Sequence, residues 1–109
     1  MSQPLATPRV RLPRTARAGE VVEVRTLMEH PMETGLRHAG APGVARDMLT
    51  QLMVRMNGEV VFSAGLHNGT SANPYHVFFL RIERSSQLDF TWTDEQGRTA
   101  RAEARITVA

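Results

Sequence analysis

The chain has 109 residues with 13 basic and 11 acidic side chains, four His and no Cys, so its formal net charge at pH 7 is only +2. Every basic residue is Arg, and the Arg residues are interspersed with Glu, which argues against a nucleic-acid-binding surface. The absence of Cys excludes disulfides, thiolate metal sites and a nucleophilic or redox-active thiol from these residues.

Short runs of alternating apolar and polar residues, separated by turn residues, predict an all-β domain with about seven strands. The first strand is expected at residues 9–12, followed by a turn segment at 15–19. The second is expected at residues 20–28, where apolar residues and a Thr occupy every other position. This period of two indicates a strand with one buried face.

The sequence Asn57-Gly58 is the strongest local signal, because both residue types accept the positive φ angles of a type I′ turn. It predicts a hairpin between strands at residues 50–56 and 59–64. The residues expected to face inward and meet across this hairpin are Leu52, Val54, Met56, Val60 and Phe62.

The strand expected at residues 75–83 is apolar on both faces. Its two sets of side chains are Phe78, Leu80 and Ile82 on one face and Val77 and Phe79 on the other. Such a strand is either central in a sandwich or has its second face against a partner.

Two further strands are expected at residues 87–93 and 101–108, with a turn at 94–97 between them. In the first of these, Leu88, Phe90 and Trp92 are expected to face inward. Seven short strands at this spacing are typical of an immunoglobulin-like antiparallel β-sandwich. We therefore predict a disordered segment at residues 1–8 and a single domain at 9–109, interrupted by a long loop at 29–49.

Catalytic motifs are lacking, since the chain has no G-x-S-x-G elbow, no H-E-x-x-H pair and no Gly-rich phosphate loop. Several acidic residues occupy outward strand positions near Arg, where solvated charge pairs are the expected arrangement. These residues are Glu20, Glu23, Glu83, Asp89 and Glu103. We predict a protein that is not an enzyme and that has no cofactor.

A metal site is the alternative that the residues leave open. His30, Met32, His67 and His76 are soft or borderline ligands, and a His/Met site for Cu(I) in a stand-alone β-sandwich would use them, whereas a blue-copper centre needs a Cys. The competing expectation is that His30 caps a strand end, His67 lies in a loop, and His38 and His76 are exposed.

Three segments together resemble the SoxZ family of sulfur-oxidation proteins: residues 9–13, residues 18–24, and residues 26–35, which end in His-Pro-Met-Glu-Thr-Gly. Further similar segments follow in the same order, so that the resemblance extends over residues 9–109. They include Asn57-Gly58, Leu66-His67, the run from Ala72 to Tyr75, Phe78-Phe79 and the run from Phe90 to Asp94. Asn68-Gly69 and His76 depart from the family pattern.

The resemblance implies an immunoglobulin-like sandwich that forms a heterodimer with a SoxY-like protein. That partner carries sulfur intermediates on a Cys in a flexible C-terminal arm and presents them to other Sox enzymes during thiosulfate oxidation. The resemblance also implies that the SoxZ-like subunit itself is not catalytic. It is expected to reach the periplasm with its signal-bearing partner, since residues 1–8 lack the basic and apolar regions of a secretory signal. Neither a membrane nor a nucleic acid is expected as a partner.

An interface with this partner is predicted at the most family-specific run, residues 30–35, and at further residues expected to be exposed. Met, Arg and aromatic side chains are the types enriched at protein interfaces. The residues assigned to it are His30, Pro31, Met32, Glu33, Thr34, Gly35, Leu66, Asn73, Pro74, Tyr75 and Phe79. Further apolar residues expected to be available on the other side of the chain are Met28, Met48 and Met53.

Overall fold

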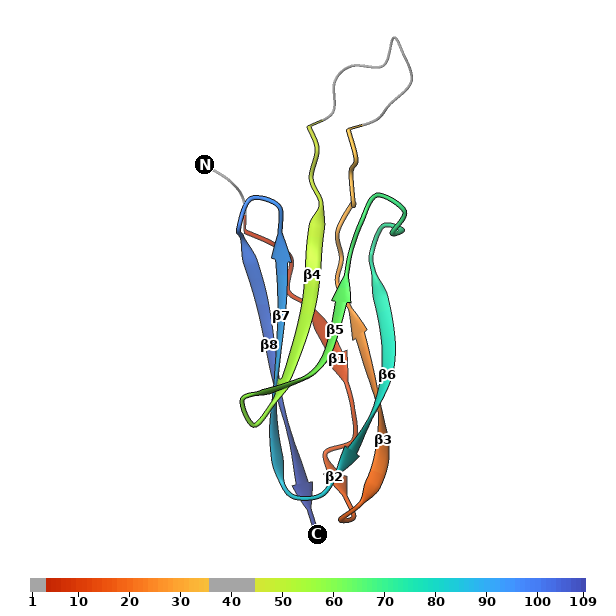
Figure 1. Ribbon diagram of the computed structural model, residues 1–109, viewed down its shortest axis with the longest axis vertical. Coiled ribbons are helices and arrows are strands. Elements are labelled where there is room, and N and C mark those ends of the chain that lie inside the picture. Colours follow the sequence, from red (N-terminus) through yellow and green to blue (C-terminus); the bar gives the residue numbers. More distant parts are fainter. Residues whose placement is uncertain (1–3, 36–44) are drawn as a thin grey trace.

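The computed structural model describes residues 4–35 and 45–109 of the chain (Figure 1). These residues form eight strands and no helix. In chain order the strands are β1 (Arg9–Arg11), β2 (Thr15–Ala16), β3 (Glu20–Leu27), β4 (Leu49–Met56), β5 (Glu59–Gly65), β6 (Tyr75–Ile82), β7 (Ser86–Asp94) and β8 (Thr99–Val108). The predicted all-β class is confirmed. The described residues accordingly contain no helix that could cross a membrane.

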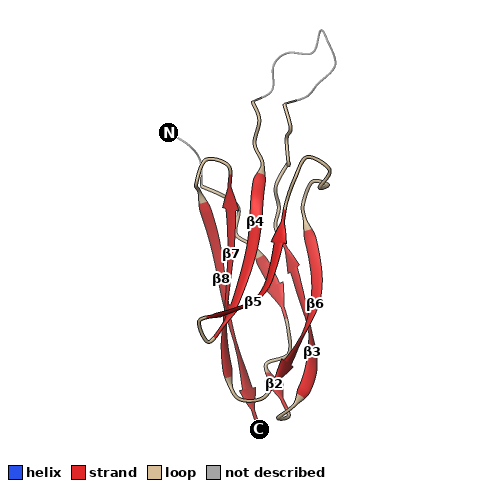
Figure 2. Ribbon diagram, in the orientation of Figure 1, coloured by secondary structure: helices blue, strands red, loops and turns tan. Residues whose placement is uncertain are grey.

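The strands form two sheets that face each other (Figure 2). One has three strands in the order β1-β3-β6, and the other has five in the order β2-β8-β7-β4-β5. All pairs are antiparallel except β2 with β8. This arrangement confirms the predicted immunoglobulin-like sandwich, with β6 at one edge of the smaller sheet.

The core lies between the two sheets and is built from alternating strand residues that were predicted to face inward. Its fully buried side chains include Trp92, Phe90, Leu88, Leu52, Val54 and Val24. The rings of Phe90 and Trp92 stack with their centroids 6.3 Å apart. Each large apolar side chain buried in this way contributes about 1.5–3 kcal/mol of transfer free energy, so this layer is the main source of stability.

The segment predicted as a turn at residues 15–19 contains a strand, so that prediction is wrong at Thr15 and Ala16. These residues pair in parallel with Thr107 and Val108, and the backbone N–H of Thr107 donates to the carbonyl oxygen of Arg14 at 2.9 Å. A two-residue strand is too short for alternation to reveal it. It adds an eighth strand to the seven expected.

The predicted hairpin is confirmed at its turn, where Asn57 and Gly58 have φ angles of 52° and 87°. One of its inward assignments is wrong: Val60 is 52% exposed and pairs with Arg55. The cause is a register shift between Val54 and Arg55, which places Val60 at the start of β5 on the outward face.

Of the Met residues expected on an available surface, Met28, Met32 and Met48 are buried, so that expectation is wrong for these three, whereas Met53 is half-buried. Met28, Met32 and Met48 lie in the core, where their flexible side chains fill the end of the sandwich beyond the sheet residues. At the N-terminus, residues 4–8 have no regular secondary structure, and Leu5 packs half-buried against the core.

Candidate functional site

The outward face of β6 carries the main group of exposed large apolar side chains in the described residues. Tyr75, Val77 and Phe79 are 54%, 41% and 64% exposed, and Val21 on the neighbouring strand β3 is 51% exposed. We call these four residues the β6 face. Of the two alternatives left open for this strand, the central position does not apply, because β6 is an edge strand. Its second apolar face is open to solvent.

Charged residues of β3 lie beside this apolar column. Arg25 is directly opposite Val77, and Glu23 is opposite Phe79. A nitrogen of the Arg25 guanidinium lies 3.2 Å from a carboxylate oxygen of Glu23. Glu23 and, to a smaller extent, Tyr75 raise the pKa of Arg25 above its ordinary value, so this cation is permanent at every physiological pH.

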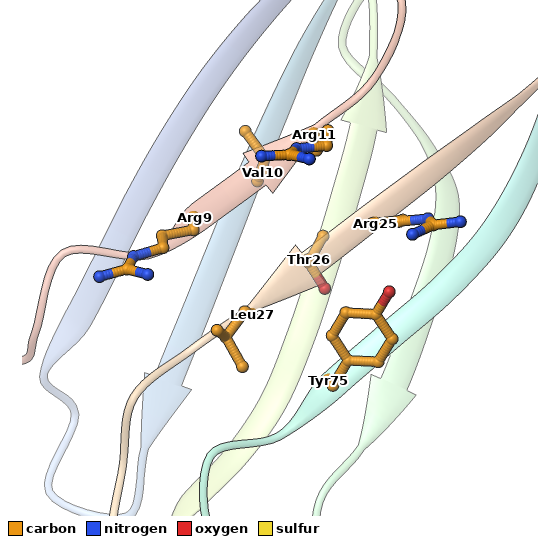
Figure 3. Close-up of a pocket in the computed structure, with 7 residues that line it drawn as sticks. All are labelled: Arg9, Val10, Arg11, Arg25, Thr26, Leu27 and Tyr75. Carbon is orange, nitrogen blue, oxygen red and sulfur yellow. The ribbon is translucent and has the colours of Figure 1, made fainter.

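On the other side of β3, strand β1 presents Arg9 and Arg11 on the same outward face. Arg11 is directly opposite Arg25, and Arg9 is opposite Leu27. Together with Tyr75 these residues line a shallow hollow of about 300 Å³ (Figure 3). The outer face of the three-stranded sheet therefore has a basic column on β1, a mixed column on β3 and an apolar column on β6.

A second group of predicted residues lies at one end of the sandwich and is held by His30. The ring of His30 is buried, and its Nδ1 accepts a hydrogen bond from the backbone N–H of Met32 at 3.0 Å. Since Nδ1 is an acceptor, a neutral ring has its proton on Nε2, which donates to Oδ1 of Asp47 at 3.2 Å. Met32 adopts a φ of 49°, which turns its N–H back to the ring.

Asp47 links this segment to the turn between β7 and β8, because Arg98 also bonds to its Oδ1 at 3.1 Å. Arg98 in turn bonds to the buried carboxylate of Asp94. Burial alone would raise the pKa of Asp94, but the hydrogen bonds and charge of Arg98 and the backbone N–H of Gln96 bring it below its ordinary value. The network ties the segment after β3 to the turn between β7 and β8.

The structure divides the eleven predicted interface residues between these two places. Tyr75 and Phe79 belong to the exposed β6 face. The others lie at the end of the sandwich, where some are buried, some half-buried and some exposed. His30, Met32, Leu66 and Pro74 are buried, Glu33 and Thr34 are half-buried, and Pro31, Gly35 and Asn73 are exposed.

Several members of the second group form hydrogen bonds within the chain. Asn73 accepts a hydrogen bond from the backbone N–H of His30 at 2.9 Å, and its own N–H donates to the His30 carbonyl oxygen at 2.8 Å. The carbonyl oxygen of Pro74 accepts from the N–H of Met28 at 3.1 Å. The run from His30 to Gly35 is thus tied to the loop before β6.

Sequence reasoning missed four residues of the exposed sheet face: Val21, Arg25, Arg11 and Arg9. Each is unremarkable within its own strand. Their significance lies in the cross-strand register, which places Arg11 opposite Arg25 and Arg25 opposite Val77. No pattern within one strand reports that pairing.

The possible metal ligands are not gathered in one place. In the described residues, no three His, Cys, Asp or Glu side chains form a group that could hold a metal ion. Both ring nitrogens of His30 have partners, and Nδ1 of His67 accepts from the N–H of Gly69 at 3.0 Å. His76, expected to be exposed, is half-buried, and burial lowers its pKa. His38 lies outside the described residues.

Comparisons with known proteins place these features in context. The family model described as "Sulphur oxidation protein SoxZ" matches residues 10–105. No curated protein sequence matches the chain.

Several solved structures share the fold at low sequence identity. A superoxide reductase (neelaredoxin) from Ignicoccus hospitalis has a TM-score of 0.77 at 18% identity, with 97% of this chain and 82% of that chain covered. The sulfur carrier protein SoxY from Chlorobium limicola f thiosulfatophilum has a TM-score of 0.68 at 16% identity, with coverages of 98% and 83%. A putative superoxide reductase from Thermotoga maritima has a TM-score of 0.71 at 13% identity, with coverages of 94% and 86%. These likenesses establish the fold alone.

Proposed function

Because this chain belongs to the SoxZ family, we propose that it is the non-catalytic half of a heterodimer with a SoxY-like protein. The partner holds sulfur intermediates on the Cys of its C-terminal arm, and the complex presents them in turn to the other Sox enzymes of thiosulfate oxidation. SoxZ proteins are in general non-catalytic subunits of the Sox system. The superoxide reductase neighbours carry no functional weight at their low identity.

The observation that carries the proposal beyond the family is the β6 face. Exposed apolar groups of this size, gathered on an edge strand, are costly to leave in water and promote unwanted pairing. A permanent partner removes both costs. Tyr75 and Phe79 are aromatic residues, which contribute much of the binding energy in interfaces. Arg25, on the neighbouring strand, is also of a residue type that is enriched at such sites.

Periplasmic location is part of the same proposal. We expect the chain to be exported while bound to its signal-bearing partner. Export in that form requires a complex that is stable when folded, which a largely apolar interface provides.

The test is co-expression of this chain with a SoxY-like protein encoded beside it, followed by size-exclusion chromatography with mass measurement. A 1:1 complex is expected. Since this chain has no Cys, the complex must also survive reducing agent, which separates binding from disulfide capture. A lone monomer beside a soluble, folded partner would overturn the proposal.

A further inference from the structure

Cations lie opposite each other at the hollow between β1, β3 and β6. Arg11 and Arg25 are direct cross-strand neighbours on the outward face, and like charges in such positions destabilise a sheet. Nearby carboxylates offset this only in part. Glu23 pairs with Arg25 at 3.2 Å, and Glu29 with Arg9 at 3.5 Å, both at exposed positions.

Arg11 differs from the other two cations, because none of the described residues forms an ion pair with it at up to 4.0 Å. Figure 3 shows the side chains of Arg9 and Arg25 extending in opposite directions, while the hydroxyl of Tyr75 points toward the Arg25 side. Spread cations around an open hollow leave room for an anion between them.

The spacing suits a particular class of anion. Opposed residues have their Cβ atoms about 5 Å apart, and alternate residues of a strand lie about 7 Å apart, so the three Arg residues border one hollow and their long, exposed side chains can turn toward an anion in it. A carboxylate offers two oxygens in one plane and is matched by a single Arg fork. A sulfonate or thiosulfate end offers three oxygens in a pyramid, which three separate donors match better.

We propose that Arg9, Arg11, Arg25 and the Tyr75 hydroxyl form a binding site for a sulfur oxyanion, such as the sulfonate end of an intermediate held on the partner's arm. The choice of sulfur over other oxyanions rests on the proposed function, in which the partner carries sulfur intermediates of thiosulfate oxidation. The hollow borders the β6 face, so an anion attached to a partner docked there has a short path to it.

The experiment is a titration of the isolated, isotopically labelled chain with sodium thiosulfate, followed through the Arg side-chain N–H signals by NMR. Sodium acetate and sodium chloride at matched ionic strength serve as competing anions. Saturable shifts at Arg11 and Arg25 are expected, with at least tenfold weaker binding of acetate. Arg11→Gln should weaken thiosulfate binding at least tenfold. Arg101→Gln, an exposed position of β8 on the other sheet, should change it less than twofold.

The proposal is overturned if acetate binds as tightly as thiosulfate, which would make the hollow a site for partner carboxylates. It is also overturned if Arg101 shifts in parallel with Arg11, or if Arg11→Gln has no effect. The titration needs no partner, so its failure leaves heterodimer formation intact. Conversely, thiosulfate binding by a chain that forms no heterodimer would overturn the proposed function and not the site.

Discussion

Phe79→Ala is expected to weaken binding of the SoxY-like partner by about 30-fold while leaving the fold intact. A Phe side chain has roughly 200 Å² of surface. Since Phe79 is 64% exposed in the free chain, about 130 Å² is available for burial by a partner, worth about 3 kcal/mol at ~25 cal/mol per Å². Ala retains part of this area, which leaves about 2 kcal/mol, or about 30-fold in Kd.

The assay is isothermal titration calorimetry of the variant with the purified partner, alongside urea denaturation of the variant alone. The free energy of unfolding should change by less than about 0.5 kcal/mol, because the side chain is already in water in the free chain. Val60→Ala is the matched control, since Val60 is 52% exposed on β5, in the other sheet. An unchanged Kd for Phe79→Ala, or an equal loss for Val60→Ala, would refute the assignment of the interface to the β6 face.

Four further changes test the same structure. Tyr75→Ala should also raise the partner's Kd tenfold or more in calorimetry, because this ring is 54% exposed on the same face. His30→Ala should lower the free energy of unfolding in urea by about 3 kcal/mol, since it leaves a buried backbone N–H without its acceptor and opens a cavity; an unchanged midpoint would contradict the role given to the ring. Because the pKa of Asp94 is lower in the folded state, its ionised carboxylate adds to the free energy of unfolding. This contribution is fully present above the ordinary pKa of 3.8 and is lost as the pH falls through the lower folded-state pKa. Asp94→Asn should therefore flatten the fall in the free energy of unfolding that is measured below about pH 4. Gly58→Ala should cost about 1 kcal/mol in thermal melts because φ is 87° there, whereas Gly65→Ala, with open space and no positive φ, should cost no strain; equal losses would rule out backbone strain as the cause.

Strand periodicity predicted most of the core, because each inward residue is determined by its own strand. The alternation in β3, β4 and β7 identified the buried layer correctly, and Asn57-Gly58 located the hairpin turn. Two features escaped because they depend on partners far along the chain. Strand β2 exists only through its parallel pairing with β8, and the outward turn of Val60 follows from a register shift against β4.

The candidate site was predictable only in part, for a similar reason. Residue types identified Tyr75 and Phe79, but whether β6 is central or at an edge is settled by sheet order, which no single strand encodes. The run beginning at His30 is distinctive in sequence, and its residues form hydrogen bonds within the chain. The sequence could not predict a bond such as that from His30 to Asp47, because these residues are far apart along the chain. The assignment of this run to the partner interface stays a prediction.

The two-layer architecture is what gives the two-faced apolar character of β6 its meaning. In a sandwich of two sheets the opposite sheet covers only the inward face of a strand, so apolar residues on the outward face need a further explanation. In β6 the inward residues Phe78 and Leu80 fill the core, while Val77 and Phe79 stay in water. The same sandwich is shared by proteins described as a superoxide reductase and as a sulfur carrier, so the fold itself is compatible with unrelated roles. What distinguishes this chain is therefore the chemistry of one sheet face, an apolar column beside a basic one, and that face is where a partner and its cargo should be sought.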